Sequence, residues 1–374
     1  MKLSRKIITL VLFGLFTAPL TGFCQSEALK VVVNNLAYYK QHSELKYLAN
    51  AKKSVDSLIK TRSDSSNLGK NIYKAIVYSS IAYIDSANKL SQPDNFFDQT
   101  VVLVNRLASS KKIYKYQTEL DFSKRCLANV FIRRGFDQIR HLDFNKAVES
   151  FESAQSYAPN FSQINAYIAY ANTRAGRLPE AVKFYNTLIT ADSVKTEYVI
   201  AASNIYKTMG DTSKALDILQ KGRRFLPADK SLMLEEANIY NNKKDYRSLE
   251  PMLKGLLDSY PNDAEVYFIA SNCYDHLDQP DRAESLYLRS IELNSSGYDP
   301  VYNLGLLYLK RSASNKNTAD AEKNRLVAAQ WLQKAYEMAP KNVNTLKLLK
   351  LIYAKNGNED QLNYINYKLQ QLTN

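Results

Sequence analysis

A cysteine and a histidine that could bind a metal ion lie close together in one short segment. Cys273 and His276 are three residues apart, and Asp278 follows shortly after. On a helix, residues at this spacing share a face, so a thiolate and an imidazole would meet one turn apart. The chain has only three His and three Cys in all, too few for a zinc-type ligand set. We therefore expect no metal site and assign Cys273 to packing in a helix seam.

The sequence carries no motif for phosphate binding or catalysis. Gly69-Lys70 ends like a phosphate-binding loop, but Asn71 stands in place of Ser or Thr and no glycine lies five residues earlier. No dinucleotide fingerprint, HExxH motif or nucleophile elbow occurs. We expect no enzyme activity and no cofactor. The alternative from another class is an enzyme with an unrecognised site in residues 25–125.

Three asparagines recur at a constant interval in the second half of the chain. Asn204, Asn238 and Asn272 are separated by steps of 34 residues. An amide side chain both donates and accepts hydrogen bonds, so a row of amides can hold the backbone of an extended peptide. Such a row needs structural elements that repeat with the same period.

The same 34-residue step orders residues of other types. One column is small: Gly135, Ala169, Ser203, Ala237, Ser271 and Gly305. Another is bulky and resumes after eleven inserted residues: Phe151, Tyr185, Leu219, Leu253, Tyr287 and Leu332. A third is typical of helix ends: Pro159, Ser193, Pro227, Pro261, Ser295 and Pro340.

These columns predict pairs of antiparallel helices. Two helices approach closely only where side chains are small, and a bulky residue fills the space beside the contact. Proline cannot continue a helix and so ends the second helix of a pair. One pair cannot bury its own apolar face, so neighbouring pairs must stack.

The pattern resembles the tetratricopeptide repeat family. Six repeats begin near residues 128, 162, 196, 230, 264 and 298, and a weaker seventh runs through Tyr353 and Gly357 to the end. The resemblance implies an all-α fold, a right-handed superhelical α-solenoid of antiparallel helix pairs over residues 126–374. Residues 25–125 show helical periodicity out of register with this step, at 45–59, 72–90 and 96–107. We expect them to be degenerate repeats that cap the solenoid, with loops at 63–67 and 91–95.

In the tetratricopeptide family, asparagine at the inner position of the first helix holds an extended peptide in the concave groove. We therefore expect Asn204, Asn238 and Asn272 to bind a peptide or protein segment. Basic side chains lie three or four residues after this inner position in most of the repeats, and they would favour an acidic partner. They are Arg140, Arg174, Lys207, His276 and Lys310. Phe268 and Tyr302 would supply apolar anchors.

Residues 1–24 are typical of a secretory signal. Lys2, Arg5 and Lys6 precede an apolar run at 7–16 that is too short for a comfortable membrane-spanning helix. We expect cleavage after Cys24 and export to the periplasm or cell envelope.

Cys24 also allows a different reading of the same segment. Leu20, Thr21 and Gly22 resemble a lipobox, although bulky Phe23 directly precedes the cysteine. Under this alternative Cys24 is the acylated first residue of an outer-membrane lipoprotein. An uncleaved anchor is a third possibility.

Basic residues are concentrated near the N-terminus. Residues 25–125 hold 16 Lys and Arg against 9 Asp and Glu, a net charge of +7. Residues 126–374 hold 31 against 28, a net charge of +3. A basic end on an exported protein indicates an anionic membrane surface or acidic partners, and we expect no nucleic acid.

The eleven inserted residues fall around 311–325, between the two helices of the sixth repeat. We expect a long loop there; a loop that carries partner specificity is the alternative. Taken together, the sequence predicts a non-enzymatic interaction scaffold or adaptor of the bacterial cell envelope. The alternative is an outer-membrane lipoprotein assembly factor anchored through Cys24. The oligomeric state is not predicted.

Overall fold

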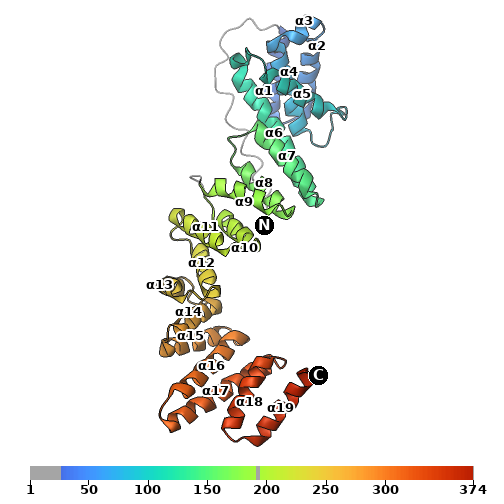
Figure 1. Cartoon of the computed structure of the whole chain (residues 1–374). Helices are drawn as coiled ribbons and strands as arrows, with labels where there is room; N and C mark the ends of the chain where they lie inside the picture. Colours follow the sequence, from blue (N-terminus) through green and yellow to red (C-terminus); the bar gives the residue numbers. More distant parts are fainter. Residues whose placement is uncertain (1–26, 191–193, 374) are drawn as a thin grey trace. The chain divides into compact units, whose positions relative to one another are not determined.

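The computed structural model describes residues 27–190 and 194–373, and this part of the chain holds 19 α-helices and no β-strand (Figure 1). The predicted signal, with Cys24, lies outside the described residues. Two compact units make up the chain, residues 1–188 and residues 189–374. The all-α prediction is confirmed.

From residue 117 onward the helices alternate as pairs joined by short turns. In unit 1 the pairs are α6 (Gln117–Arg140) with α7 (Phe144–Tyr157), and α8 (Gln163–Arg174) with α9 (Leu178–Ile189). In unit 2 they are α10 (Thr196–Thr208) with α11 (Thr212–Phe225), α12 (Lys230–Asn242) with α13 (Tyr246–Ser259), α14 (Ala264–His276) with α15 (Pro280–Leu293), α16 (Tyr298–Ser314) with α17 (Thr318–Met338), and α18 (Val343–Lys355) with α19 (Glu359–Thr373). These seven pairs lie where the 34-residue step places them.

Helices cross closely where the sequence places its small residues. A Cβ atom added to Gly135 on α6 would lie 2.5 Å from the ring of Phe151 on α7. A Cβ on Gly305 would lie 2.8 Å from Leu332 on α17. Every member of the small column is buried, and no member of the bulky column is more than 7% exposed. The predicted packing of small against bulky residues is confirmed.

In six of the seven pairs, one residue of the turn lies in the left-handed backbone region, and the α16–α17 turn (residues 315–317) is the exception. These residues follow the 34-residue step and resume after the insertion: Leu142, Gly176, Gly210, Lys244, Asp278 and Gly357. The next residue often caps the second helix: the side chains of Asp143, Asp211 and Asp245 accept a backbone N–H of its first turn. Because only three of the six turn residues are glycine, the sequence pattern does not reveal this column.

The insertion at 311–325 is helical, so the expected long loop was wrong. Only residues 315–317 separate α16 from α17. α16 has 17 residues against 13 in α14, and α17 has 21 against 14 in α15. The eleven extra residues therefore lengthen the two helices by four and seven residues. The Ser312 hydroxyl donates to the Ala321 carbonyl oxygen (2.7 Å) and joins the extensions.

The N-terminal part of unit 1 is helical as predicted but differs in its loops. Its helices are α1 (Glu27–His42), α2 (Leu45–Ser57), α3 (Arg62–Ser66), α4 (Leu68–Ile84), α5 (Phe96–Ala108) and the 3₁₀ helix η2 (Ile113–Tyr116). Residues 91–95 form a loop, whereas the loop expected at 63–67 is mostly the short helix α3. The predicted boundary after residue 125 falls inside α6.

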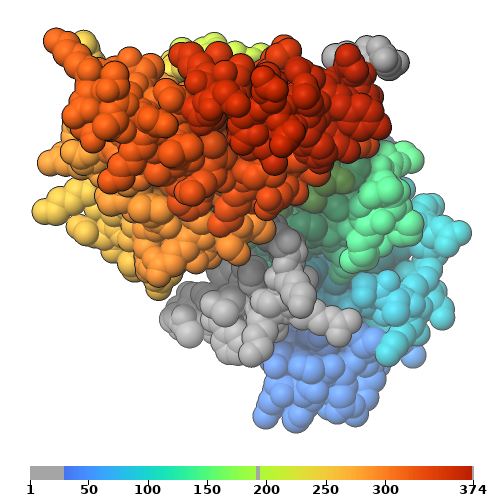
Figure 2. Space-filling view, turned by 90° about the horizontal axis from the view of Figure 1, so that it is seen from below, coloured from blue at the N-terminus to red at the C-terminus, as the bar shows by residue number. Residues whose placement is uncertain are grey.

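The last pairs of unit 2 form a continuous surface. In Figure 2, α16–α19 (orange to red) cover the near face of this unit, and side chains fill the spaces between their helices. Buried residues of α16 and α17 pack with those of α15 and α18. The inserted turns are thus part of an array that continues through α19.

Candidate binding surface

Successive first helices of unit 2 pack against one another. α10 contacts α12, α12 contacts α14, and α14 contacts α16. Among the residues described, contacts of that extent do not join the successive second helices α11, α13, α15 and α17. The first helices therefore form the inner layer of this unit. We call the solvent-facing side of α10, α12, α14 and α16 the inner face.

The three predicted asparagines lie on the inner face, one each on α10, α12 and α14. Asn204 is exposed, and Asn238 and Asn272 are half-buried. The Nδ2 atom of Asn272 donates to Oδ1 of Asn241 on α12 (2.8 Å). The side chains of Asn204 and Asn238 make no hydrogen bond with the described residues. Two of the three amides are thus available, while Asn272 already holds two helices together.

One predicted cation of unit 1 interacts within its own helix, and the other interacts with the preceding helix pair. Arg140 forms an ion pair with Asp137 on the same helix (2.6 Å). The Arg174 guanidinium lies over the Phe144 ring, 5.2 Å from its centre. Both side chains are exposed.

The cations of the inner face have carboxylate partners on neighbouring helices. Lys207 Nζ lies 3.0 Å from Glu235 on α12. Lys310 Nζ lies 3.7 Å from Asp275 and 3.4 Å from Asp278. Exposed ion pairs contribute only about 0–1 kcal/mol, so a ligand carboxylate can exchange with these partners.

The predicted apolar anchors are half-buried. The Phe268 ring centre lies 6.3 Å from that of Tyr287, which is fully buried. Tyr302 stacks on Tyr298 at 5.5 Å, on the same helix. Part of each ring is therefore committed to the core, and only the remainder can contact a ligand.

Polar bridges join successive first helices, and none of them was predicted from the sequence. Glu235, Asn241 and Asp275 accept from Lys207, Asn272 and Lys310, at separations of 28, 31 and 35 residues. Complementary side chains in neighbouring repeats were the available signal. Because the partners are not 34 residues apart, these bridges do not form columns in the repeat pattern.

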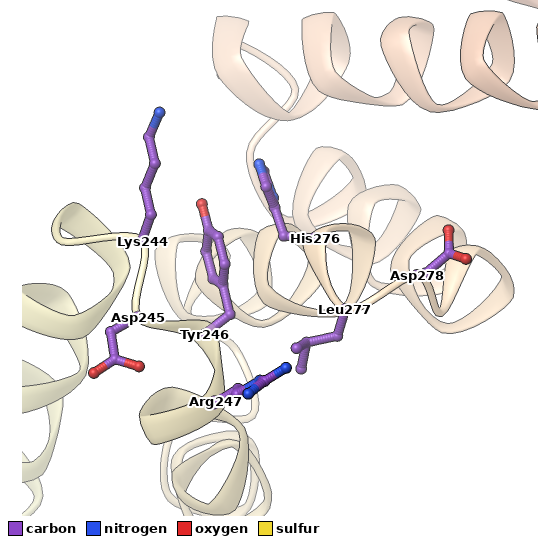
Figure 3. Close-up of a pocket in the computed structure, with 7 residues that line it drawn as sticks. All are labelled: Lys244, Asp245, Tyr246, Arg247, His276, Leu277 and Asp278. Carbon is purple, nitrogen blue, oxygen red and sulfur yellow. The ribbon is translucent and has the colours of Figure 1, made fainter.

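A shallow hollow lies between the α12–α13 and α14–α15 turns. It has a volume of about 470 Å³, and its lining includes Tyr246 and His276 (Figure 3). Their rings stack with centres 4.3 Å apart. The pKa of the Tyr246 hydroxyl is raised by burial, so the hydroxyl remains protonated at neutral pH.

Cys273 and His276 do not converge on a common point. The Cys273 thiol is fully buried and lies 3.4 Å from the Tyr246 carbonyl oxygen. The His276 ring is exposed, with Nδ1 2.8 Å from the Asn272 carbonyl oxygen. Within residues 27–190 and 194–373, no three His, Cys, Asp or Glu side chains are placed to hold a metal ion.

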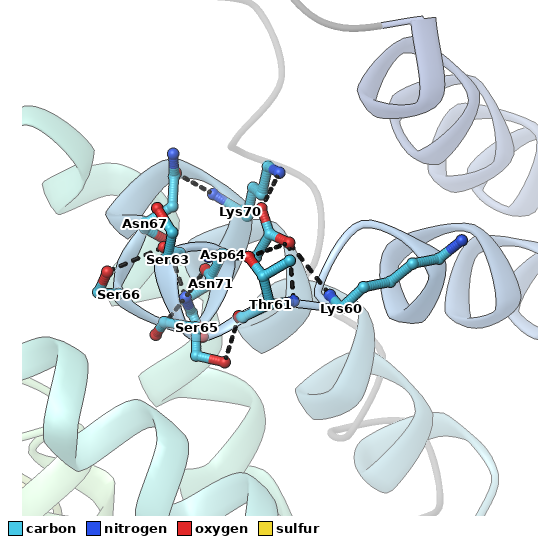
Figure 4. A network of polar contacts seen from close by, with 9 residues as sticks. All are labelled: Lys60, Thr61, Ser63, Asp64, Ser65, Ser66, Asn67, Lys70 and Asn71. Atoms are coloured by element: carbon cyan, nitrogen blue, oxygen red, sulfur yellow. Dashed lines mark hydrogen bonds and ion pairs between the residues drawn. The ribbon is translucent and has the colours of Figure 1, made fainter.

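Lys70, of the Gly69-Lys70 pair, belongs to a polar network that fixes α3 against α4 (Figure 4). Lys70 Nζ lies 2.6 Å from the Asp64 carboxylate, which also accepts from the Thr61 backbone N–H and hydroxyl. Asn71 Nδ2 donates to backbone carbonyls, among them that of Asn67 (2.8 Å). The Lys70 contact, followed by those of Thr61, holds the pKa of Asp64 well below its usual range. These groups serve local structure.

Two further observations concern cysteines and membranes. Cys126 and Cys273 are both buried and free of disulfides. In the part of the chain that is described, no helix has the length and apolar character needed to cross a membrane. The Cys24 lipidation alternative lies outside this part.

Family comparisons match the repeats directly. Tetratricopeptide repeat models match residues 133–194, which span most of two helix pairs, and residues 264–296, which span α14 and α15. The helix pairs and their period agree with this match. The chain therefore contains tetratricopeptide repeats.

Several known proteins are similar to this chain at low identity. The BBSome complex member BBS4 of Bos taurus is 18% identical over 261 residues, which cover 61% of this chain and 46% of BBS4. The chain thus spans about half the length of that curated relative. The solved chain of MamA from Desulfovibrio magneticus RS-1, which runs from residue 41 to the end, is 16% identical, with a TM-score of 0.42 over 49% of this chain and 97% of that solved chain. YrrB, described as a tetratricopeptide repeat protein with an unusual peptide-binding site, is 21% identical, with a TM-score of 0.45 over 54% of this chain and 97% of YrrB.

Proposed function

We propose that this chain is a non-enzymatic scaffold that binds a peptide or protein segment on the inner face of unit 2. The observation that carries the proposal is the placement of Asn204 and Asn238. They lie on adjacent, mutually packed first helices, and their amides have no hydrogen-bond partner among the described residues. Tetratricopeptide repeat proteins act mainly through such interactions, and nothing described in the chain points to catalysis.

Binding would combine directional and charged contacts. The two amides would each donate to and accept from the backbone of an extended segment. Lys207 and Lys310 would exchange their present carboxylate partners for acidic side chains of the ligand, at small cost because the pairs are exposed. A segment of mixed polar and acidic character fits this face.

We place this activity in the bacterial cell envelope. The support is the basic and apolar order of residues 1–24, which is typical of export signals. Mass spectrometry of the mature N-terminus distinguishes the alternatives. A diacylglycerol-modified Cys24 would identify an outer-membrane lipoprotein, whereas an unmodified N-terminus near residue 25 would identify a released protein.

The inner-face proposal is tested by site-specific photo-crosslinking in cells. A photoreactive residue replaces Asn238 on α12 in one variant and exposed Asp217 on α11 in the matched control. The proposal expects one or a few specific protein adducts at position 238 and few at 217. Capture from position 217 alone would overturn it.

A further inference from the structure

A basic turn in unit 1 projects cations and one aromatic side chain into solvent. The turn comprises residues 111–115, between α5 and α6. Lys111, Lys112 and Lys115 are exposed and make no ion pair with any described residue. Tyr114, placed among them, is 69% exposed. No peptide contact proposed for unit 2 uses this turn.

The turn is held in place by the residues that point inward. Ile113 and Tyr116 pack against the core cluster formed by α4, α5 and α6. In a 3₁₀ helix, side chains three residues apart share an edge, so these two inward residues orient the intervening side chains outward. A Cβ on Gly69 would lie 3.0 Å from the Tyr116 hydroxyl, which shows how closely the turn is seated on α4. The lysines and Tyr114 are thus presented by an ordered segment.

The acidic groups nearby in sequence do not neutralise this turn. Residues 25–125 carry a net charge of +7. Glu119 and Asp121, in the first turns of α6, are the acidic residues nearest in sequence, and neither forms an ion pair with a described residue. Asp121 accepts a hydrogen bond from Gln117 (2.8 Å) instead. The three lysines of the turn therefore have no ion-pair partner among the described residues.

We propose that the basic turn docks unit 1 onto an anionic phospholipid surface. Lysines near such a surface are attracted by its negative potential, and the attraction falls off within a Debye length. Tyrosine is enriched at the membrane interface, where the ring meets the acyl boundary and the hydroxyl stays with the headgroups. The three lysines would supply the electrostatic attraction and the exposed tyrosine would supply the interfacial contact, and both come from the same turn. An acidic protein is the competing partner, but a protein ligand would be expected to cover Tyr114 with a shaped pocket, whereas a lipid interface needs only exposure.

Vesicle binding tests this docking. The chain without residues 1–24 is mixed with vesicles of equal parts phosphatidylcholine and phosphatidylglycerol, or of phosphatidylcholine alone. We expect binding to the anionic vesicles only, and loss of that binding at high salt. Changing all three lysines (Lys111→Gln, Lys112→Gln and Lys115→Gln) should lower partitioning on the order of 100-fold.

A matched control removes the same charge elsewhere. Lys341, Lys347 and Lys350 are exposed in unit 2, and replacing each with Gln should change partitioning by less than about twofold, because the proposal assigns the lipid contact to the turn of unit 1. Equal loss in both triple variants would overturn the proposal, since net charge alone would then explain binding. Circular dichroism confirms that the variants retain their helices.

A spectroscopic readout locates the contact. In a Trp331→Phe background, Tyr114→Trp leaves one tryptophan in the turn. Its emission should shift to the blue on adding anionic vesicles and stay unchanged with neutral ones. An unchanged spectrum during vesicle binding would overturn docking through this turn, as would capture of an acidic protein at position 114 without any vesicle binding.

Discussion

Gly135 and Gly255 both lie inside helices, yet their surroundings lead to opposite expectations for the same substitution. A Cβ at Gly135 would lie 2.5 Å from the fully buried Phe151 ring, whereas one at Gly255 would lie at an ordinary 3.4 Å from Met233. Gly135→Ala should lower stability by about 1–2 kcal/mol, because overpacking outweighs the gain in helix propensity. Gly255→Ala should raise stability by up to about 1 kcal/mol. Urea unfolding followed by circular dichroism measures both, and a stabilised Gly135→Ala variant would contradict the close crossing.

The two buried cysteines lead to an expectation about pH. Burial raises the pKa of Cys126 and of Cys273 to about 12, against about 8.5 in an unfolded chain. Between these values the folded state binds more protons than the unfolded state, so the thiols' contribution to stability is lost as pH rises. Stability should fall more steeply above about pH 8.5 in the wild type than in a Cys126→Ala, Cys273→Ala variant. Equal slopes would contradict thiol burial.

Single residues were predicted well where only position mattered and poorly where a partner mattered. The burial of Ala237 and Leu253 follows from the repeat period alone. The hydrogen bond from Asn272 to Asn241 does not follow from the period, because it depends on the rotamers of two side chains in different repeats. The same reason explains why the ion pair of Lys207 with Glu235 was not predicted.

Turn geometry leads to a prediction at the scale of the element. Leu142 has φ of +61° and is 70% exposed, so its side chain gains little from burial. Left-handed backbone costs an L-residue roughly 1–2 kcal/mol, and glycine avoids most of it. Leu142→Gly should therefore be about 1 kcal/mol more stable than Leu142→Ala, which keeps the strain without the large side chain. A more stable alanine variant in thermal or urea unfolding would contradict the turn conformation.

The helical insertion can be removed in register. Deleting residues 312–322 would place Lys323 at the turn position of Lys244 and Asn324 at the capping position of Asp245. Because the 34-residue step is restored, we expect a folded chain with cooperative unfolding. Deleting eleven residues from the preceding pair, 274–284, breaks the step and should abolish cooperative unfolding. Similar behaviour of the two deletions would contradict the importance of register.

Element boundaries were predictable from period and turn residues, but two connections were not. The insertion contains few residues that break helices, and its Ala, Glu and Lys residues are good helix formers. The prediction of a loop rested on the number of extra residues and not on their helix propensity. α3 begins with a reciprocal capping box of Thr61 and Asp64, a sequence signal that the loop prediction overlooked. Both errors came from treating polar segments as loops.

At the scale of the whole molecule, the fold class and the repeat family were predictable because seven helix pairs repeat one packing solution. The binding partner was not predictable, since binding in such arrays depends on the side chains that do not take part in helix packing. Only Asn204 and Asn238 of the predicted amide row remain without partners among the described residues. The predicted acidic character of the ligand stays a prediction, because the inner-face lysines are already paired.

The most direct test is the affinity of the segment captured at position 238 for two matched double variants. Asn204→Ala with Asn238→Ala removes both inner-face amides, and Gln330→Ala with Asn363→Ala removes two exposed amides from the second helices α17 and α19. At about 1 kcal/mol per hydrogen bond, the inner-face variant should bind about 30-fold more weakly, and the control should bind like the wild type. Unchanged affinity in the inner-face variant, with weakened binding in the control, would contradict the account.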